Sequence, residues 1–285
     1  MAGMVSNVKY DGVLGMWYGK APGVDRSGDI FRHANFLGVG KNGGVLAVAG
    51  DDPSCKSSTL PSQSEPALFD AMMPIFYPGN VQEILDLGRY AYEMSRYSGL
   101  WSGFKIVTDI ADAFGSAIVH PERININIPD FQYNGQPWKH TQNAKLVGHH
   151  SLPTEKEIHL GRIEAAKHFL AFNNINKITV QSDKDSIGII TAGKTYYDIV
   201  EALDSLGWDE AFLNEKGIRI LKLGATFPVD SKTIKQFSKN LNEIFVIEEK
   251  RSFIEMLIKE EVYNYQNKPL IVGKSDEHNL SLIHI

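Results

Sequence analysis

The densest group of side chains that could do chemistry lies between Asp51 and Ser58, in the run DDPSCKSS. It combines two carboxylates, a lysine and several hydroxyls. Hydroxyls can hold a phosphate or carboxylate oxygen, and paired aspartates can hold a divalent cation. The same residue types also dominate solvated turns, so the pattern alone leaves a binding loop and a simple turn both open.

A second polar segment, Gly19 to Gly28, reads GKAPGVDRSG and is interpreted as a glycine-rich loop. Arg26 offers a planar fork of N–H donors that suits a carboxylate. The alternative is an exposed Asp25–Arg26 surface pair, which contributes about 0–1 kcal/mol.

The apolar run Gly44–Gly50 (GVLAVAG), between these two segments, predicts a buried strand. A strand is also expected near Val13–Trp17, and a helix over Ile30–Leu37. A buried strand that delivers a polar loop at its carboxyl end is typical of ligand sites in open α/β sheets. We therefore expect the two polar segments to form one site.

Further elements support this sheet. Asn80, followed three residues later by Glu83, is expected to cap a helix. Strands are expected over 104–107 and 117–119, and the Pro-rich stretch 120–153 predicts an irregular connector. Thr154 is expected to open a helix that continues to Phe172.

A second α/β unit follows the connector. Strands are predicted over 177–180, 188–191, 218–223 and 244–247, separated by helices, the last of which Ser252 and Glu255 are expected to cap. Strands that alternate with helices predict a parallel sheet in a three-layer domain. The acids before that last helix are expected to favour its positive N-terminus.

Residues 188–195 (GIITAGKT) have the spacing of a phosphate-binding P-loop, and 244–249 (IFVIEE) resembles the strand that holds magnesium beside it. However, the residues that should wrap the phosphate look like a strand. Gly193 is therefore interpreted as a strand-to-helix turn, and nucleotide binding through Lys194, Thr195 and Glu249 is kept as an alternative.

The histidines and the cysteine are weaker signals. His149, His150, His159 and His168 do not have metal-ligand spacing and are interpreted as solvated, so no metal site is expected. Cys55 is the only cysteine, which excludes an internal disulfide and any four-cysteine cluster within this chain.

Composition favours an ordinary cytoplasmic protein. The chain has 285 residues, is 43% hydrophobic and carries a net charge of −5. This length suggests two domains. The acidic balance gives no reason to expect nucleic acid or a membrane as partner. No apolar run approaches the ~20 residues of a membrane span, and the N-terminus is not a secretory signal.

Three long strings carry a resemblance to a known family. These are residues 15–35 (GMWYGKAPGVDRSGDIFRHAN), 43–65 (GGVLAVAGDDPSCKSSTLPSQSE) and 188–207 (GIITAGKTYYDIVEALDSLG), supported by 218–230 and 244–255. They resemble the thiamine-pyrophosphate-dependent 2-oxoacid:ferredoxin oxidoreductases, and within that family the fused indolepyruvate type. The resemblance covers nearly the whole chain, to about Glu277.

The resemblance implies a fold and a division of the chain. Residues 1–120 would be a partial pyrimidine-type thiamine domain, 121–180 a connector with a helix, and 181–277 a transketolase-C-like three-layer α/β domain, with an unassigned tail at 278–285. The implied reaction is oxidative decarboxylation of a 2-oxoacid such as indolepyruvate, with transfer of the acyl group to coenzyme A and of electrons to ferredoxin.

The resemblance also implies that this chain is an internal fragment, inactive alone. The family's activating glutamate is expected before Met1. Mg²⁺ and the 4Fe–4S clusters are expected in parts outside this chain, and thiamine pyrophosphate would be shared with such a part. Assembly as a homo- or hetero-oligomer is expected. A non-catalytic interaction module is the other alternative.

Carried onto this sequence, the resemblance makes Arg26 the candidate for binding the substrate carboxylate. Other residues would line the same mouth: Lys20, Asp25, His33, Asp51, Asp52, Ser57, Ser58, Gln63 and Glu65.

Overall fold

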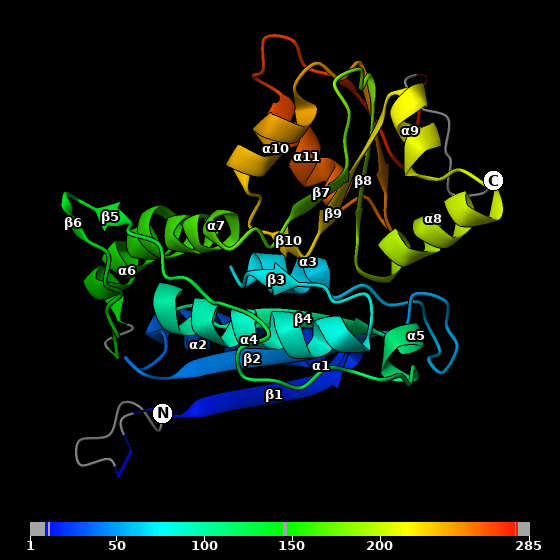
Figure 1. The fold of residues 1–285 in the computed structure, drawn as a ribbon. Helices are drawn as coiled ribbons and strands as arrows, with labels where there is room; N and C mark the ends of the chain where they lie inside the picture. The colour runs from blue at the N-terminus through cyan, green and yellow to red at the C-terminus, as the bar shows by residue number, and fades with distance from the viewer. Residues whose placement is uncertain (1–8, 11, 145–146, 277, 279–285) are drawn as a thin grey trace.

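The computed structural model describes residues 9–10, 12–144, 147–276 and 278. Within these residues the chain forms two five-stranded sheets and a small two-stranded one. In Figure 1 the two large sheets lie one above the other, with the earlier part of the chain below. The α/β fold class is confirmed. The unassigned tail at 278–285 lies almost entirely outside the described residues.

The lower sheet has the order β1-β2-β4-β3-β10. β1 (Leu14–Lys20), β2 (Gly44–Asp51), β4 (Ser102–Val107) and β3 (Ile75–Phe76) pair in parallel, and the predicted strand over 44–50 is the inner strand β2. The apolar run suits this position, because parallel strands are buried on both faces. The last strand, β10 (Ala225–Phe227), comes from far along the chain and pairs antiparallel with β3.

Helices cover both faces of this sheet. α1 (Ala21–Arg26) and α2 (Gly28–Leu37) bury Val24 and Phe31 in one core, and α3 (Glu65–Asp70) adds Leu68. α4 (Val81–Ser98) packs on the opposite face through a second core that includes Leu87 and Met94. The predicted cap of α4 is confirmed, since the Asn80 side chain accepts the Glu83 N–H at 2.9 Å.

The predicted glycine-rich loop over 19–28 is wrong. β1 runs directly into α1, with Pro22 in the first turn. Proline suits that position because its missing N–H has no partner there in any case. The glycines serve packing instead: a Cβ on Gly19 would come within 2.8 Å of the Trp17 ring, and Gly23 lies over the same ring.

The connector is largely irregular, as predicted, but the strand expected over 117–119 is absent. Ile118 and Val119 are exposed there, and so cannot be held by a buried sheet. The remaining elements are listed in chain order: α5 (Thr108–Ala111), β5 (Gln132–Tyr133), β6 (Gln136–Pro137), η2 (Gly148–His150), α6 (Ser151–Glu157), the π-helical turn η3 (Ile158–Arg162) and α7 (Ile163–Phe172).

The helix expected to open at Thr154 begins earlier, at Ser151. Thr154 does not cap it, because its hydroxyl donates to the carbonyl of His150, one turn back. Further along, Arg162 is fully buried in η3 and bonds to the Glu157 carboxylate and to the carbonyls of Asn35 and Thr141. These bonds anchor the connector helices to the lower sheet.

The upper sheet has the order β12-β11-β8-β9-β7. Its strands are β7 (Lys177–Val180), β8 (Ile187–Ala192), β9 (Ile218–Leu223), β11 (Glu243–Ile247) and β12 (Leu270–Val272). All the strands predicted for this region are present. The pairing is parallel as expected, except that the edge strand β7 runs antiparallel to β9.

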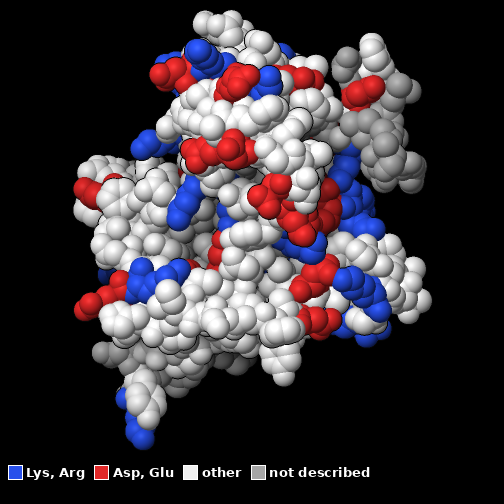
Figure 2. All heavy atoms as spheres, turned by 45° about the vertical axis from the view of Figure 1, so that its right-hand side comes forward, with Lys and Arg blue, Asp and Glu red and all other residues white. Residues whose placement is uncertain are grey.

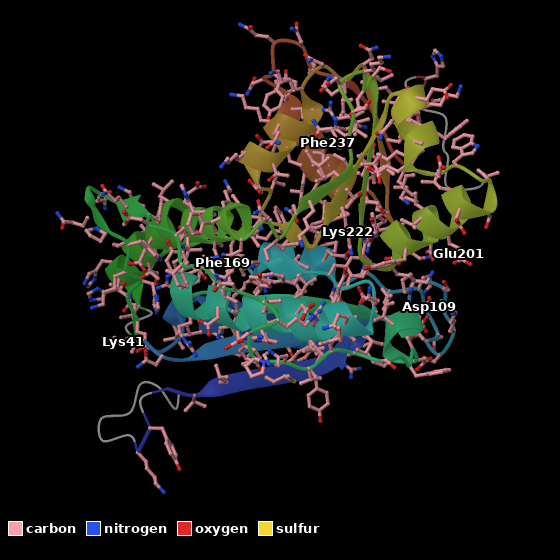
Figure 3. All side chains as sticks on the ribbon, in the orientation of Figure 1. Lys41, Asp109, Phe169, Glu201, Lys222 and Phe237 are labelled. Carbon is pink, nitrogen blue, oxygen red and sulfur yellow. The ribbon has the colours of Figure 1, made fainter. Side chains whose placement is uncertain are left out.

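Helices flank the upper sheet as a three-layer domain requires (Figure 1). α8 (Gly193–Ser205) and α9 (Glu210–Lys216) lie on one side, and α10 (Ser231–Ser238) and α11 (Ile254–Val262) on the other. Gly188 is needed for packing: a Cβ there would meet the Leu241 side chain at 2.7 Å and the Phe237 ring at 3.0 Å. Figure 3 labels Phe237 above and Phe169 below, in separate cores.

The cap of α11 differs from the expected Ser252–Glu255 pair. The Glu248 carboxylate accepts the N–H groups of Phe253, Ile254 and Glu255 at 2.8–3.1 Å. An acid before this helix therefore favours its N-terminus, as predicted, but by direct hydrogen bonds. Burial raises the pKa of Glu248, although these N–H groups oppose that effect.

The proposed division of the chain at residues 120 and 180 stays a prediction. The structure adds two facts that bear on it. β7, within the stretch assigned to the connector, is an edge strand of the upper sheet, and β10, within the later domain, completes the lower sheet. In the described part of the chain, no helix is both long and apolar enough to cross a bilayer.

Candidate functional site

The carboxyl ends of the upper strands lie against the edge of the lower sheet that β3 and β10 form (Figure 1). The segment after β3 meets the segments around β10 and α8 in direct backbone contact, because the Tyr77 N–H donates to the Gly224 carbonyl at 3.0 Å. A Cβ on Gly79 would lie 2.2 Å from the Gly193 carbonyl oxygen, and one on Gly193 would strike the Tyr77 ring. Gly193 has a φ of +53° and is required at this close approach.

This geometry decides the interpretation of residues 188–195. The residues that would wrap a phosphate in a P-loop are the strand β8, and Gly193 is the strand-to-helix turn, as predicted. Lys194 pairs with Asp198 on the outside of α8 at 2.6 Å. The nucleotide-binding alternative therefore has no support from the structure.

A buried ionic cluster joins the two sheets at this junction. Lys105, in β4, places its Nζ 2.6 Å from Glu65 Oε1 and 3.1 Å from Glu249 Oε2. The Tyr77 hydroxyl donates to the same Glu249 oxygen at 2.6 Å, and the Lys105 ammonium lies 4.2 Å from the centre of the Tyr77 ring. Glu249 follows β11, so the cluster crosses from the lower sheet to the upper one.

The cluster holds Lys105 in its charged form. Burial alone would lower the pKa of Lys105, which is 2% exposed, but the nearby Glu65, Tyr77 and Glu249 raise it well above its ordinary value. Burial raises the pKa of Tyr77 far above its ordinary value, so its hydroxyl stays a donor. The Glu65 Oε2 atom is buried without a hydrogen-bond partner in the described structure.

Asp51 lies at the end of β2, beside this cluster. Its carboxylate accepts the Ser64 hydroxyl at 2.5 Å and the Ser64 N–H at 2.8 Å, which fixes the start of α3. Burial raises the pKa of Asp51, and the Lys105 charge offsets part of that effect. Asp51 thus organises the loop rather than presenting its carboxylate to solvent.

Asp52 shapes the loop that follows. Its carboxylate accepts the N–H groups of Ser57 at 2.7 Å and Lys56 at 2.8 Å, and these hydrogen bonds lower the pKa of Asp52 to about 2. The Asp52 N–H in turn donates to the Ser62 hydroxyl. Both aspartate carboxylates are therefore used in hydrogen bonds that shape the loop. Among the described residues, no group of three or more acidic, histidine or cysteine side chains could hold a metal ion.

The loop and α1 enclose a shared hollow of about 430 Å³. Lys20 reaches across it to the Ser57 carbonyl at 3.4 Å. Gln63 closes the far side through its side-chain amide, which donates to the Arg251 carbonyl and accepts the Arg251 N–H. The hollow thus has walls from both halves of the chain, an arrangement that is frequent among binding clefts.

Only some of the residues predicted to line the substrate and cofactor site lie around the hollow. Lys20, Asp25, Ser57, Ser58 and Gln63 line the hollow, whereas Asp51, Asp52 and Glu65 are buried and bonded within the protein. Arg26, in the last turn of α1, and His33, on α2, are exposed and do not line it. His33 Nδ1 lies 2.9 Å from the Asp29 carbonyl oxygen on its own helix.

Sequence reasoning missed four residues of this region: Lys105, Tyr77, Glu249 as a partner of the cluster, and Arg251. Lys105 is a charged residue inside an apolar strand, which is a usable signal for a buried ion pair. Arg251 follows a run of charged residues that looks like a solvated strand end. Figure 2 shows basic and acidic side chains side by side where the upper and lower halves meet.

The four histidines considered as metal ligands lie apart from the hollow and contact other side chains. The rings of His149 and His150 lie 4.1 Å apart, and His168 stacks on Phe131. His159 lines a surface groove between α3, α7 and α11. Cys55 is partly exposed in the Asp52 loop and has a φ of +56°.

The sequence is similar to proteins of known family. Residues 177–284 match the family of indolepyruvate oxidoreductase domains. The chain is 25% identical over 264 residues to the indolepyruvate oxidoreductase subunit IorA of Pyrococcus horikoshii, and 27% identical over 256 residues to that of Pyrococcus abyssi. Each alignment covers 89% of this chain and 37% of the relative.

Over most of its length the chain is similar to indolepyruvate oxidoreductase subunits. The predicted resemblance to the 2-oxoacid:ferredoxin oxidoreductase family is confirmed by these matches, and by IorA of Archaeoglobus fulgidus at 26% identity over 82% of this chain. The chain spans little more than a third of the length of these curated relatives. Neither a nucleotide-binding protein nor a non-catalytic module is supported.

The fold is also similar to that of a solved 2-oxoacid:ferredoxin oxidoreductase. The 2-oxoglutarate:ferredoxin oxidoreductase from Magnetococcus marinus, solved with 2-oxoglutarate, coenzyme A and succinyl-CoA bound, superposes with a TM-score of 0.58 at 12% identity. The match covers 93% of this chain and 50% of that one, and it shows a shared fold.

Proposed function

We propose that this chain forms one wall of the cleft of a thiamine-pyrophosphate-dependent oxidoreductase. The enzyme would oxidatively decarboxylate 2-oxoacids of the indolepyruvate type, pass the acyl group to coenzyme A and reduce ferredoxin, in the cytoplasm. The observation that carries the proposal is the hollow between α1 and the 57–63 loop, at the carboxyl end of a parallel sheet in this family's fold. Ligands of open α/β sheets bind at that edge.

The donors around the hollow fit part of the cofactor. The donors are hydroxyls, one amide, Lys20 and Arg251, which suit a carboxylate, and Asp25 adds an acceptor that suits a neutral heterocycle. They do not form a site for a magnesium diphosphate, which needs several oxygen ligands. In this proposal another domain or subunit holds the diphosphate, Mg²⁺ and the 4Fe–4S clusters. The cofactor supplies the electron sink for decarboxylation.

This chain's share is binding and orientation. Lys20 and Arg251 stand on opposite walls of the hollow, and each can make a charge-assisted hydrogen bond to the substrate carboxylate. Arg26 remains a second candidate, one residue beyond the lining residue Asp25. The bonds between the Gln63 side chain and the Arg251 backbone hold Arg251 against the 57–63 loop.

A titration of the isolated chain tests the shared cleft. Isothermal calorimetry with thiamine pyrophosphate and Mg²⁺ is expected to show no tight binding to this chain alone. Tight, magnesium-dependent binding to the chain alone would overturn the division of the cofactor between two parts.

An activity assay tests the carboxylate site. The chain, expressed in its genomic context with its flanking coding sequence, is assayed for indolepyruvate-dependent reduction of a viologen dye with coenzyme A. Arg251→Ala is expected to raise KM at least tenfold, since a charged hydrogen bond contributes about 1.5–3 kcal/mol. Arg89→Ala, an exposed arginine of α4, is the matched control. An unchanged KM in Arg251→Ala with a raised KM in Arg26→Ala would move the role to Arg26.

A further inference from the structure

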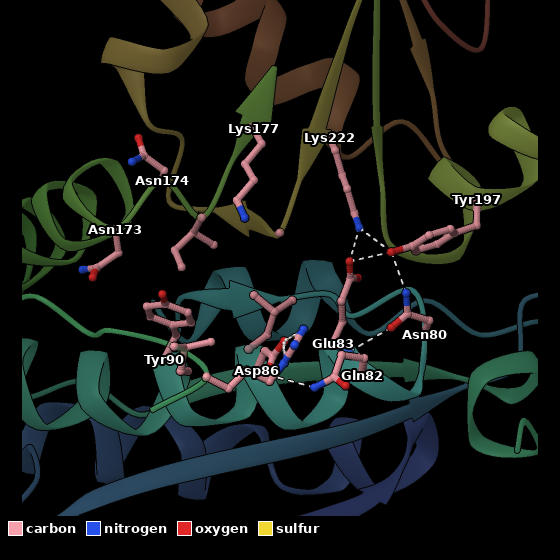
Figure 4. A pocket seen from close by; sticks show the side chains of 15 residues that line it. Asn80, Gln82, Glu83, Asp86, Tyr90, Asn173, Asn174, Lys177, Tyr197 and Lys222 are labelled. Atoms are coloured by element: carbon pink, nitrogen blue, oxygen red, sulfur yellow. Dashed lines mark hydrogen bonds and ion pairs between the residues drawn. The ribbon is translucent and has the colours of Figure 1, made fainter. Parts of the chain in front are cut away.

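A second cavity, of about 350 Å³, lies at the same junction but shares no lining residue with the hollow. Its floor is the first half of α4 and its roof is the edge of the upper sheet, formed by β7 and β9 (Figure 4). Its volume is in the range of small-molecule sites.

Two lysines face this cavity from neighbouring strands. Lys177 of β7 is directly opposite Lys222 of β9 in the antiparallel register. Figure 4 shows both side chains pointing from the sheet toward α4. Like charges directly opposite each other on paired strands destabilise the pair. The arrangement is therefore unfavourable unless something negative lies between the ammonium groups.

The protein compensates only one of them. Lys222, whose side chain is 13% exposed, forms an ion pair with Glu83 and contacts the Tyr197 hydroxyl at 2.9 Å. The Tyr197 hydroxyl donates to Glu83 at 2.7 Å. Lys177 makes no hydrogen bond or ion pair with any residue that the structure describes.

The charges around the cavity leave an excess of one positive charge. Arg123 is matched by Asp86, which it contacts at 3.1 Å, and Lys222 by Glu83, so Lys177 is the unmatched group. Burial lowers the pKa of Lys222, Lys177 contributes to that lowering, and Glu83 opposes it. The cavity therefore has a positive potential that its own carboxylates do not cancel.

We propose that this cavity binds a phosphate group, free or as part of a small metabolite, between Lys177 and Lys222. Lysine binds phosphate as a point charge. A phosphate group carries enough negative charge to meet two ammonium groups at once. The ligand would remove the repulsion across β7 and β9 and would link the upper sheet to α4. This site is separate from the substrate hollow of the proposed function and does not depend on it.

The first test is binding of inorganic phosphate and glycerol 3-phosphate to the chain, by calorimetry and by thermal unfolding, against sodium chloride at equal ionic strength. Both phosphates are expected to raise Tm, and Lys177→Gln to weaken binding at least tenfold. Lys41→Gln, a distant exposed lysine labelled in Figure 3, is the matched control. Tighter binding of the ester would indicate a metabolite, and equal binding would indicate free phosphate.

A second variant separates binding from folding. In phosphate-free buffer, Lys177→Glu is expected to raise Tm by about 1–3 °C, because an opposite-charge pair replaces a like-charge pair. The same variant is expected to lose the response to phosphate. A phosphate response equal in the wild type, Lys177→Gln and Lys177→Glu, or no response in the wild type, would overturn the proposal.

Discussion

Lys105 and Lys222 are both lysines near the carboxyl end of a strand, and both reach across the junction of the two sheets. The Lys105 side chain is 3% exposed and meets two carboxylates, whereas that of Lys222 is 13% exposed, meets one, and stands opposite a second lysine. Figure 3 places Lys222 where the upper sheet meets the lower half. In the first cluster the lysine has two carboxylate partners, and in the second a cation is left unmatched.

This difference separates two roles for buried charge. A buried charge costs several kcal/mol in desolvation and is retained only when partners compensate it. The Lys105 cluster satisfies that condition with groups from both sheets, so it fixes their relative position. Lys222 satisfies it through Glu83, whereas Lys177 is exposed, needs no such partner to be retained, and can meet a ligand.

The largest expected effect comes from Lys105→Met. Removing the buried cation leaves Glu65 and Glu249 as uncompensated carboxylates, which should lower the free energy of unfolding by about 3–5 kcal/mol. Urea unfolding followed by circular dichroism measures the loss. Adding Glu65→Gln should recover part of it. A loss below about 1 kcal/mol would show that the cluster does not hold the sheets together.

Tyr77→Phe should cost less, about 1.5–3 kcal/mol, because it removes one hydrogen bond to a charged group while Lys105 still pairs with Glu249. The same unfolding experiment measures it. Tyr90→Phe is a suitable control, since the Tyr90 hydroxyl only approaches the exposed Asn125 carbonyl at 3.4 Å. Equal losses in the two variants would argue against a special role for the Glu249 contact.

Lys222→Met should cost on the order of 1 kcal/mol, well below Lys105→Met. Glu83 keeps its bonds to Tyr197 and to the Gly79 N–H, and the variant removes the repulsion between Lys177 and Lys222. If the two lysine variants lost equal stability, the contrast between a lysine with two carboxylate partners and a lysine with one would fail.

The smallest effect belongs to Asp52 and appears only in acid. Its pKa is lowered from 3.8 to about 2, so its contribution to stability is present above pH 4 and is lost as the pH falls through 2. Hydrogen exchange at the Lys56 and Ser57 amides should accelerate over that interval. In Asp52→Asn these amides should exchange faster already at neutral pH, and the acid-dependent step should disappear.

Local patterns predicted the elements well. The glycine-bounded run at 44–50 and the Asn80 cap depend on neighbours within a few residues, and both are present. The error at 19–28 has the same origin, since glycines that accommodate the Trp17 ring have the composition of a loop. Only the position of that ring distinguishes the two, and the ring lies outside the segment.

The site was predictable only in part, because its contacts are distant in the sequence. Lys105 and Glu249 are separated by 144 positions, and Tyr77 and Glu249 by 172. No spacing rule relates such residues. The loop that carries Ser57, Ser58 and Gln63 was recognised from its composition, but which of its side chains face the hollow depends on the Asp52 bonds.

The short strand β10 determines how the protein should behave when its chain is cut. Because it lends its hydrogen bonds to a sheet whose other members all precede it by more than a hundred positions, the earlier part of the chain cannot complete its sheet after separation, whereas the upper sheet lies wholly in the later part. A single cleavage in the exposed stretch after α5 should therefore yield two fragments that stay associated under native conditions. The earlier fragment produced by itself should recover its structure only when the later one, which carries β10, is added.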